Sequence, residues 1–150
     1  MTQKTNQFNL TTKRYAEKDI ENMIEKELYK TYAFSVEDKF GDSGITGLCI
    51  LKFDYNLKSV EIDSLLMSCR IIGRNIEYAI IDFIINLMKE RGINTINSKF
   101  IKTKKNEQVK DFYNKCSFNV TQTNESVINY ELEISNYNKR KPNYIDIVYE

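Results

Sequence analysis

Apolar residues recur with a helical period in three parts of the chain. Residues 15–29 carry theirs on one face, opposite a face of Glu and Lys. Residues 74–91 give the strongest pattern, because apolar side chains follow the i, i+3, i+4 rule and Gly92 stands where a left-handed C-cap belongs. A shorter helix is expected over residues 106–115, with Asn106 as its N-cap.

Other segments have short apolar runs or the period-two alternation of strands. They are residues 8–11, 32–36, 45–53, 60–68, 93–100, 117–120 and 127–134. Two glycines and two aspartates in residues 38–44 predict a turn between two of these strands. Residues 136–150 are expected to form a C-terminal extension strand. Its apolar part, 144–149, would cover a sheet edge or pair with a neighbouring chain in a homodimer.

The order of these elements predicts one mixed α/β domain over residues 1–150. A meander of strands is followed by alternating strands and helices, which gives a mixed sheet with helices on its faces. No internal repeat and no linker rich in Gly or Ser divides the chain. Its 150 residues also match the length of one ordinary domain.

Composition excludes several kinds of chemistry. The chain has no His, so His general bases, Ser-His or Cys-His pairs and His metal ligands are excluded. The cysteines, Cys49, Cys69 and Cys116, lie far apart and form no CxxC pair, so they cannot build a zinc site alone. We therefore expect no metal. An odd number of cysteines without a disulfide framework fits a reducing, cytoplasmic location.

The charges nearly balance, since 22 Lys and Arg stand against 21 Asp and Glu. A net charge of +1 gives no global field for a nucleic acid, and no apolar run is long enough to span a membrane. We expect neither kind of partner, and the polar start of the chain predicts no secretory signal. One local cluster is basic: Lys99, Lys102, Lys104 and Lys105. It is either a solvated loop or a landing site for a phosphopantetheine phosphate or an acidic carrier protein.

The element order and two local stretches resemble the N-acetyltransferase (GNAT) superfamily. Residues 69–77 stand between a strand and the long helix, where GNAT enzymes carry a Q/R-x-x-G-x-G/A loop. Residues 106–118 resemble the N-x5-F/L-Y-x-K-x-G-F pattern of the family, with Ser117 in place of Gly. The resemblance implies a GNAT fold, whose mixed, largely antiparallel sheet splays in the middle and carries helices on both faces. The splay would open a slot for a pantetheine arm, between the strand ending near Ser68 and the strand at 93–99.

The resemblance also implies a site. Loop amides and a helix N-terminus bind the pyrophosphate of acetyl-CoA in GNAT enzymes. The cofactor contacts here would be Met67, Ser68, Cys69, Arg70, Gly73, Arg74, Asn75 and Asn106. Tyr113 would protonate the departing thiolate, and the carboxylates available as a general base are Glu61 and Asp63. Structural alternatives remain open: a core tyrosine at 113, and ion pairs of Arg70 and Arg74 with Asp63 or Glu77.

The register of the loop bears on cofactor binding. Counted from Arg70, it reads Arg-x-x-Gly-x-Asn, close to the acetyl-CoA motif. Counted back from the helix, it reads Ile72-x-x-Asn75-x-Glu77, and the informative positions are lost. We favour the second register because helical periodicity anchors it. Glu77 would then repel a pyrophosphate, so acetyl-CoA or acyl-phosphopantetheine would bind weakly or not at all.

Three stretches, residues 5–9, 38–42 and 67–74, resemble the C-terminal domain of the FkbH-like proteins of methoxymalonyl-type extender-unit biosynthesis. In that family a haloacid-dehalogenase-like domain loads a glyceryl group onto an acyl carrier protein, but this chain has no Asp-x-Asp-x-Thr signature. The resemblance implies one of two functions. The first is an acyltransferase that uses acyl-CoA or an acyl carrier protein and an unidentified acceptor. The second is a non-catalytic module that docks a carrier protein or a dehalogenase-like partner.

Overall fold

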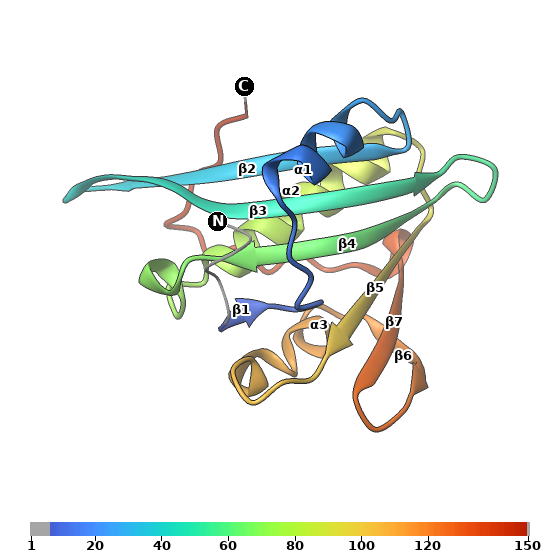
Figure 1. The fold of residues 1–150 in the computed structure, drawn as a ribbon. Coiled ribbons are helices and arrows are strands. Elements are labelled where there is room, and N and C mark those ends of the chain that lie inside the picture. The colour runs from blue at the N-terminus through green and yellow to red at the C-terminus, as the bar shows by residue number, and fades with distance from the viewer. Residues whose placement is uncertain (1–6, 150) are drawn as a thin grey trace.

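The computed structural model describes residues 7–149 as one large sheet with α1 in front of it and α2 behind (Figure 1). The sheet has the order β2-β3-β4-β5-β7-β6, and β1 pairs with β4 off this path. Among the strands of residues 7–149, only β4 and β5 pair in parallel, which confirms the predicted mixed, largely antiparallel sheet. The strands are β1 (Phe8–Asn9), β2 (Tyr29–Asp38), β3 (Gly41–Asp54), β4 (Ser59–Met67), β5 (Thr95–Ile101), β6 (Asn119–Thr123) and β7 (Val127–Glu133).

The helices are three α-helices and three short 3₁₀ turns among residues 7–149. They are α1 (Glu17–Ile24), α2 (Ile76–Glu90), α3 (Phe112–Lys115), η1 (Cys69–Ile71), η2 (Glu107–Val109) and η3 (Ile134–Asn136). Helix α2 confirms the strongest periodic pattern of the sequence. It buries a stripe of isoleucines against the sheet, because residues three and four apart share one face of a helix. Gly92 ends it at φ +72°, and the amide of Ile93 donates to the carbonyl of Met88, as in a Schellman motif.

Helix α1 is shorter than its hydrophobic pattern predicts. The helix ends at Ile24, and none of its residues is fully buried. Tyr29 belongs to β2 instead, where it pairs with Lys52, and the carbonyl of Leu28 accepts the amide of Phe53 at 2.7 Å. Leu28 and Tyr29, which the periodicity assigned to the last turn of the helix, therefore bond to β3 instead.

The helix predicted over residues 106–115 is broken in two, η2 and α3. Asn106 makes no side-chain cap bond and is fully buried. Its Oδ1 accepts the amide of Thr103 at 2.8 Å, and its Nδ2 donates to the carbonyls of Asn9 at 3.0 Å and Ile101 at 2.9 Å. The amide group thus satisfies backbone groups of two segments, residue 9 and residues 101–103, and the predicted N-cap role is wrong.

Strands β2 and β3 form a hairpin that projects beyond the end of β4 (Figure 1). The predicted turn at 38–44 is much tighter, because β3 already begins at Gly41. The carboxylate of Asp38 accepts the amide of Phe40, and that of Asp42 accepts the amide of Gly44, both at 2.7 Å. These bonds preorganise the turn and leave Phe40 at its tip, 86% exposed.

The predicted extension strand at 136–150 is wrong for its described part, because residues 137–149 form no strand. This tail packs on α2, where the buried carboxylate of Asp82 accepts the hydroxyl of Tyr137 and the amides of Arg140 and Lys141. A buried charge needs such partners, and here the tail backbone supplies them. Glu150 lies outside the described residues.

Candidate functional site

The sheet splays between β4 and β5, as predicted. The two strands pair from Ser59 with Thr95 to Ile62 with Ser98. Beyond that point β4 continues to Met67 and β5 to Ile101 without pairing to each other, and Figure 1 shows them diverging. The slot implied for a pantetheine arm would lie in this gap.

The gap is filled by the chain's own residues 8–11, called here the β1 plug. Phe8 pairs with Met67 and Asn9 with Leu66 on the β4 side. Leu10 then bridges the gap, since its amide donates to Leu65 at 3.3 Å and its carbonyl accepts from Ile101 at 2.8 Å. All four plug residues are at most 2% exposed. The slot is therefore closed from within by backbone hydrogen bonds to both of its walls.

Side chains fix the plug in place. The hydroxyl of Thr11 donates to the carbonyl of Asp63 at 3.0 Å, and Asn106 donates to Asn9. The ring of Phe8 packs edge-on against Phe112 of α3, with centroids 5.2 Å apart. Sequence reasoning placed a strand here but not in the slot, because no spacing in residues 8–11 distinguishes one sheet position from another.

The two predicted carboxylates have separate partners. Glu61 forms an ion pair with Lys99 at 3.0 Å. Asp63 is buried, and its oxygens accept Lys13 Nζ at 2.5 Å and the hydroxyl of Tyr15 at 2.6 Å. Burial and the Asp63 carboxylate raise the pKa of Tyr15 above its ordinary value. Sequence analysis missed Lys13 and Tyr15, which tie the segment after the plug to β4.

Tyr113 is a core residue in this structure. Its ring packs among those of Phe112, Phe118 and Tyr130. Its hydroxyl is buried without a hydrogen-bond partner of normal geometry, and so is that of Ser98 nearby. Burial raises the pKa of Tyr113 well above its ordinary value, and Ser98 opposes this only in part. The hydroxyl stays protonated, and with the slot closed it faces protein alone.

The loop between β4 and α2 holds most of the predicted cofactor residues. Helix α2 begins at Ile76 with Asn75 before it, so Glu77 falls in the first turn as the helix-anchored register predicts. Asn75 adopts the left-handed conformation at φ +62°, and its side chain donates to the hydroxyl of Tyr144 at 2.9 Å. One oxygen of Glu77 is buried without a partner, and burial raises the pKa of this carboxyl.

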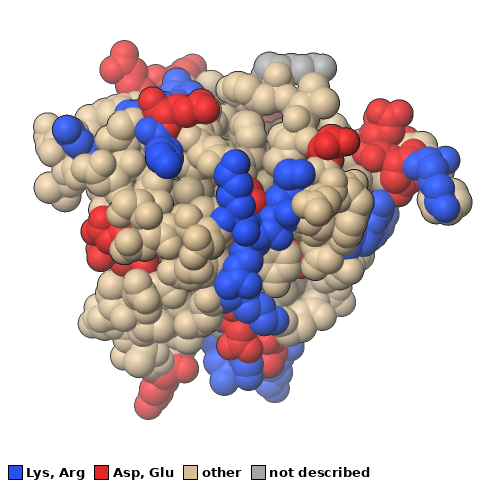
Figure 2. Space-filling model, turned by 180° about the vertical axis from the view of Figure 1, so that it is seen from behind, with Lys and Arg blue, Asp and Glu red and all other residues tan. Residues whose placement is uncertain are grey.

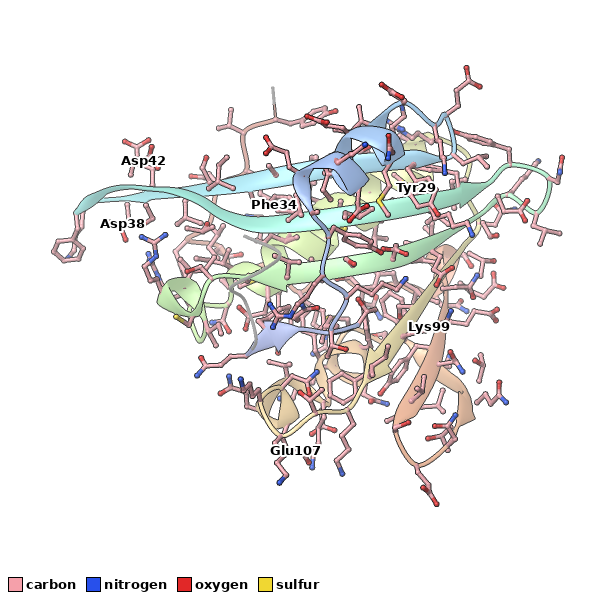
Figure 3. All side chains as sticks on the ribbon, in the orientation of Figure 1. Tyr29, Phe34, Asp38, Asp42, Lys99 and Glu107 are labelled. Atoms are coloured by element: carbon pink, nitrogen blue, oxygen red, sulfur yellow. The ribbon has the colours of Figure 1, made fainter. Side chains whose placement is uncertain are left out.

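The arginines of this loop do not pair with Asp63 or Glu77. Arg74 forms an ion pair with Asp38 at 2.6 Å. Figure 3 shows Asp38 on the projecting hairpin. Arg70 is exposed and donates to the hydroxyl of Ser68 at 3.3 Å. The other two predicted residues of this loop are Cys69 and Gly73. Cys69 is exposed, and Gly73 has φ +80°.

Two predicted cofactor residues lie apart from this loop surface. Met67 is fully buried and pairs with Phe8 of the plug. Asn106, also fully buried, binds the next plug residue, Asn9. Both therefore contact the plug in the positions where the resemblance implied contacts with a cofactor.

An open groove of about 730 Å³ lies beside the closed slot. The ion pair of Glu61 and Lys99 belongs to its lining, and Figure 3 shows Lys99 on β5. Asn97 and Asn129 contribute amides, and Tyr55 and Leu57 form an exposed apolar rim. The groove combines a polar floor with an apolar rim, so it could hold a ligand of mixed character.

The predicted lysine cluster continues into η2. Glu107 lies between Lys102 at 3.9 Å and Lys110 at 3.3 Å. Lys104 and Lys105 are exposed and form no ion pair with any described residue. Figure 2 shows Lys and Arg gathered in a band from the middle to the bottom of the rear face. We call Lys102, Lys104, Lys105 and Lys110 the lysine loop.

Residues 7–149 contain no group of three or more side chains able to hold a metal ion. None of their helices is long and apolar enough to cross a membrane.

No protein-family model matches the chain, and no curated protein is significantly similar to it. Solved structures do match. A protein from Desulfovibrio desulfuricans described as an acetyltransferase of the GNAT family gives a TM-score of 0.64 at 12% identity, over 77% of this chain and 76% of that one. The ribosomal-protein-S18-alanine N-acetyltransferase of Escherichia coli gives 0.62 at 13%, over 92% and 86%.

The PaiA N-acetyltransferase of Thermoplasma acidophilum, solved in complex with coenzyme A, gives a TM-score of 0.58 at 20% identity, over 79% of this chain and 80% of that one. At such identities a structural match establishes the fold and leaves the activity open. The splayed sheet, the parallel pairing of β4 with β5 and the long helix after β4 agree with this result. The chain has the fold of the GNAT N-acetyltransferases.

Proposed function

We propose that this chain is a GNAT-fold docking module for an acyl carrier protein, which works by binding and not by transferring an acyl group. One observation carries the proposal: the β1 plug occupies the gap between β4 and β5 in which a thioester arm would lie. The residues implied as acid and base support it, because Tyr113 is enclosed and Asp63 already holds Lys13 and Tyr15.

The strength of the plug decides between binding and catalysis. Burial of a Phe or Leu side chain contributes roughly 1.5–3 kcal/mol, and a buried hydrogen bond contributes about 1 kcal/mol more. Withdrawing Phe8 and Leu10 therefore costs on the order of 5 kcal/mol, which leaves roughly one molecule in several thousand open. Apparent affinity for a thioester arm falls by the same factor, from micromolar toward millimolar.

The lysine loop is the surface that we assign to the partner. Residues 99–115 carry six lysines and two acids in a chain whose net charge is only +1. Such a local field attracts the acidic face of a carrier protein, which the FkbH-like resemblance implies as partner alongside a dehalogenase-like enzyme. Because Asn106 fixes the backbone at Thr103 and Ile101, the loop is preorganised for docking.

The experiment is a pair of calorimetric titrations of the full chain. We expect no heat of binding with acetyl-CoA at micromolar concentrations, and salt-sensitive binding of a holo acyl carrier protein. The double variant Lys104→Glu with Lys105→Glu should abolish carrier binding, and Lys18→Glu on the exposed surface of α1 should leave it intact. Micromolar affinity for acetyl-CoA would contradict the proposal. So would carrier binding that the double variant in the lysine loop leaves unchanged.

An acyltransferase is the second candidate, and the open groove beside Glu61 favours it. A groove on that face could hold an acceptor, with Glu61 as its general base once the ion pair with Lys99 opens. This activity requires withdrawal of the plug. The acetyl-CoA titration therefore separates the two candidates directly.

A further inference from the structure

Strand β2 is an outer strand of the sheet with an open edge. Its ten residues span about 33 Å, and within residues 7–149 it pairs only with β3. Both register shifts in that pairing are extra residues on β3, so β2 itself runs without interruption. Residues 30–38 make no backbone hydrogen bond outside the sheet to any described residue. A long edge of this kind, free of proline, is a template for another chain.

Exposed apolar side chains gather at this edge. Ile24 and Leu28 stand before the first residue of β2, and Phe40 follows its last residue at the hairpin tip. Ile45, also exposed, lies one strand in from the edge, on β3, where it pairs with Ser35. Behind the strand, Tyr149 packs on Phe83, whose ring also meets those of Tyr32 and Phe34. Isolated apolar residues need no explanation, but a set along one edge marks an interface.

The edge is complementary to a second copy of itself. Antiparallel pairing centred on Phe34 places Lys30 opposite Asp38 of the partner subunit. It also brings the exposed Phe40, just beyond one end of β2, toward Leu28 of the partner subunit, just beyond the other end. Moving the centre by one residue along β2 would place Lys30 opposite Val36 or Phe40 of the partner subunit, which loses the charge pair. Asp38 is already oriented by Arg74 at 2.6 Å, so the carboxylate is held at the edge.

We propose that the chain forms a homodimer in which two β2 strands pair antiparallel and join the two sheets. The contact is isologous, so each favourable pair occurs twice about the two-fold axis. The charge pair fixes the register. Dimerisation removes the apolar side chains at both ends of the strand from water. The carrier-binding lysine loop and the β1 plug take no part in this interface.

Sedimentation velocity on the full chain tests the proposal. We expect a dimer for the wild type. Lys30→Glu places like charges opposite each other twice, and Phe40→Ser removes both apolar end contacts. Each variant should therefore raise the dimer dissociation constant by about tenfold or more. Leu57→Ser and Lys104→Glu change exposed residues away from β2 and serve as matched controls. Thermal melts should show that all four variants remain folded.

Either of two results would overturn the dimer. One is a wild type that stays monomeric up to millimolar concentration. The other is a dimer that both β2 variants leave unchanged, which would place the interface elsewhere. Neither result bears on carrier binding, because the calorimetric titration tests that proposal through substitutions at Lys104 and Lys105.

Discussion

The side chain of Asn106 donates a hydrogen bond to the backbone carbonyl of Asn9 at 3.0 Å, across 97 positions of sequence. The same amide group donates to Ile101 and accepts from Thr103, so one buried residue holds both the β1 plug and the lysine loop. The closed slot and the proposed docking surface therefore depend on one another.

Replacing Asn106 should destabilise the protein strongly. Asn106→Ala removes the hydrogen bonds of a fully buried amide and leaves the carbonyls of Asn9 and Ile101 unsatisfied. We expect a loss of about 3 kcal/mol in the free energy of unfolding, measured by urea denaturation. Asn138→Ala in the exposed tail is the control. A loss no larger than that of the control would mean that the hydrogen bonds of Asn106 contribute little to stability.

Shortening the plug should open the slot. Phe8→Ala removes a buried ring from Phe112 and should cost about 3–5 kcal/mol of stability. The open state then becomes more populated, so the variant should bind acetyl-CoA more tightly than the wild type if residues 68–75 still accept a pyrophosphate. Val148→Ala in the tail, at a residue that is 85% exposed, should change neither the stability nor the affinity.

The fold follows from the sequence where local patterns decide it. Helix α2 and Gly92 are predicted because burial and capping leave a regular trace in the sequence. Local patterns do not predict the position of the plug, the break near Asn106 or the path of the tail, because each depends on contacts between distant residues. The bonds of Asn106 to Asn9 and of Asp82 to Arg140 carry no local signal. Sequence periodicity likewise placed Glu77 correctly in its first turn but said nothing of its burial.

Glu77 should make stability depend on pH. Burial raises the pKa of its carboxyl in the folded protein above the ordinary value of 4.5. The protonated form therefore favours the fold, and that contribution is lost as pH rises through the folded-state pKa. Glu77→Gln should be more stable than the wild type at pH 7, with the difference shrinking toward pH 4. Equal denaturant midpoints for the two proteins at pH 7 would contradict this.

Asp82 should be the anchor of the C-terminal tail. Asp82→Asn replaces a carboxylate that accepts the amides of Arg140 and Lys141 with a group that has only one acceptor oxygen. We expect about 3 kcal/mol lower stability. We also expect faster tryptic cleavage after Lys139 and Arg140, measured by mass spectrometry. The control, Asp146→Asn, changes an exposed carboxylate and should keep the wild-type cleavage rate.

Amide hydrogen exchange at Leu10 and Ile101 tests the closed slot most directly. The amide of Leu10 donates to Leu65, and that of Ile101 donates to Leu10, so both bonds break when the plug withdraws. We predict that both amides exchange slowly, with opening free energies on the order of 5 kcal/mol or more, and that saturating acetyl-CoA leaves their rates unchanged. Rapid exchange at both amides, or exchange that speeds up when acetyl-CoA is added, would show that the plug leaves the slot and would contradict the docking-module account.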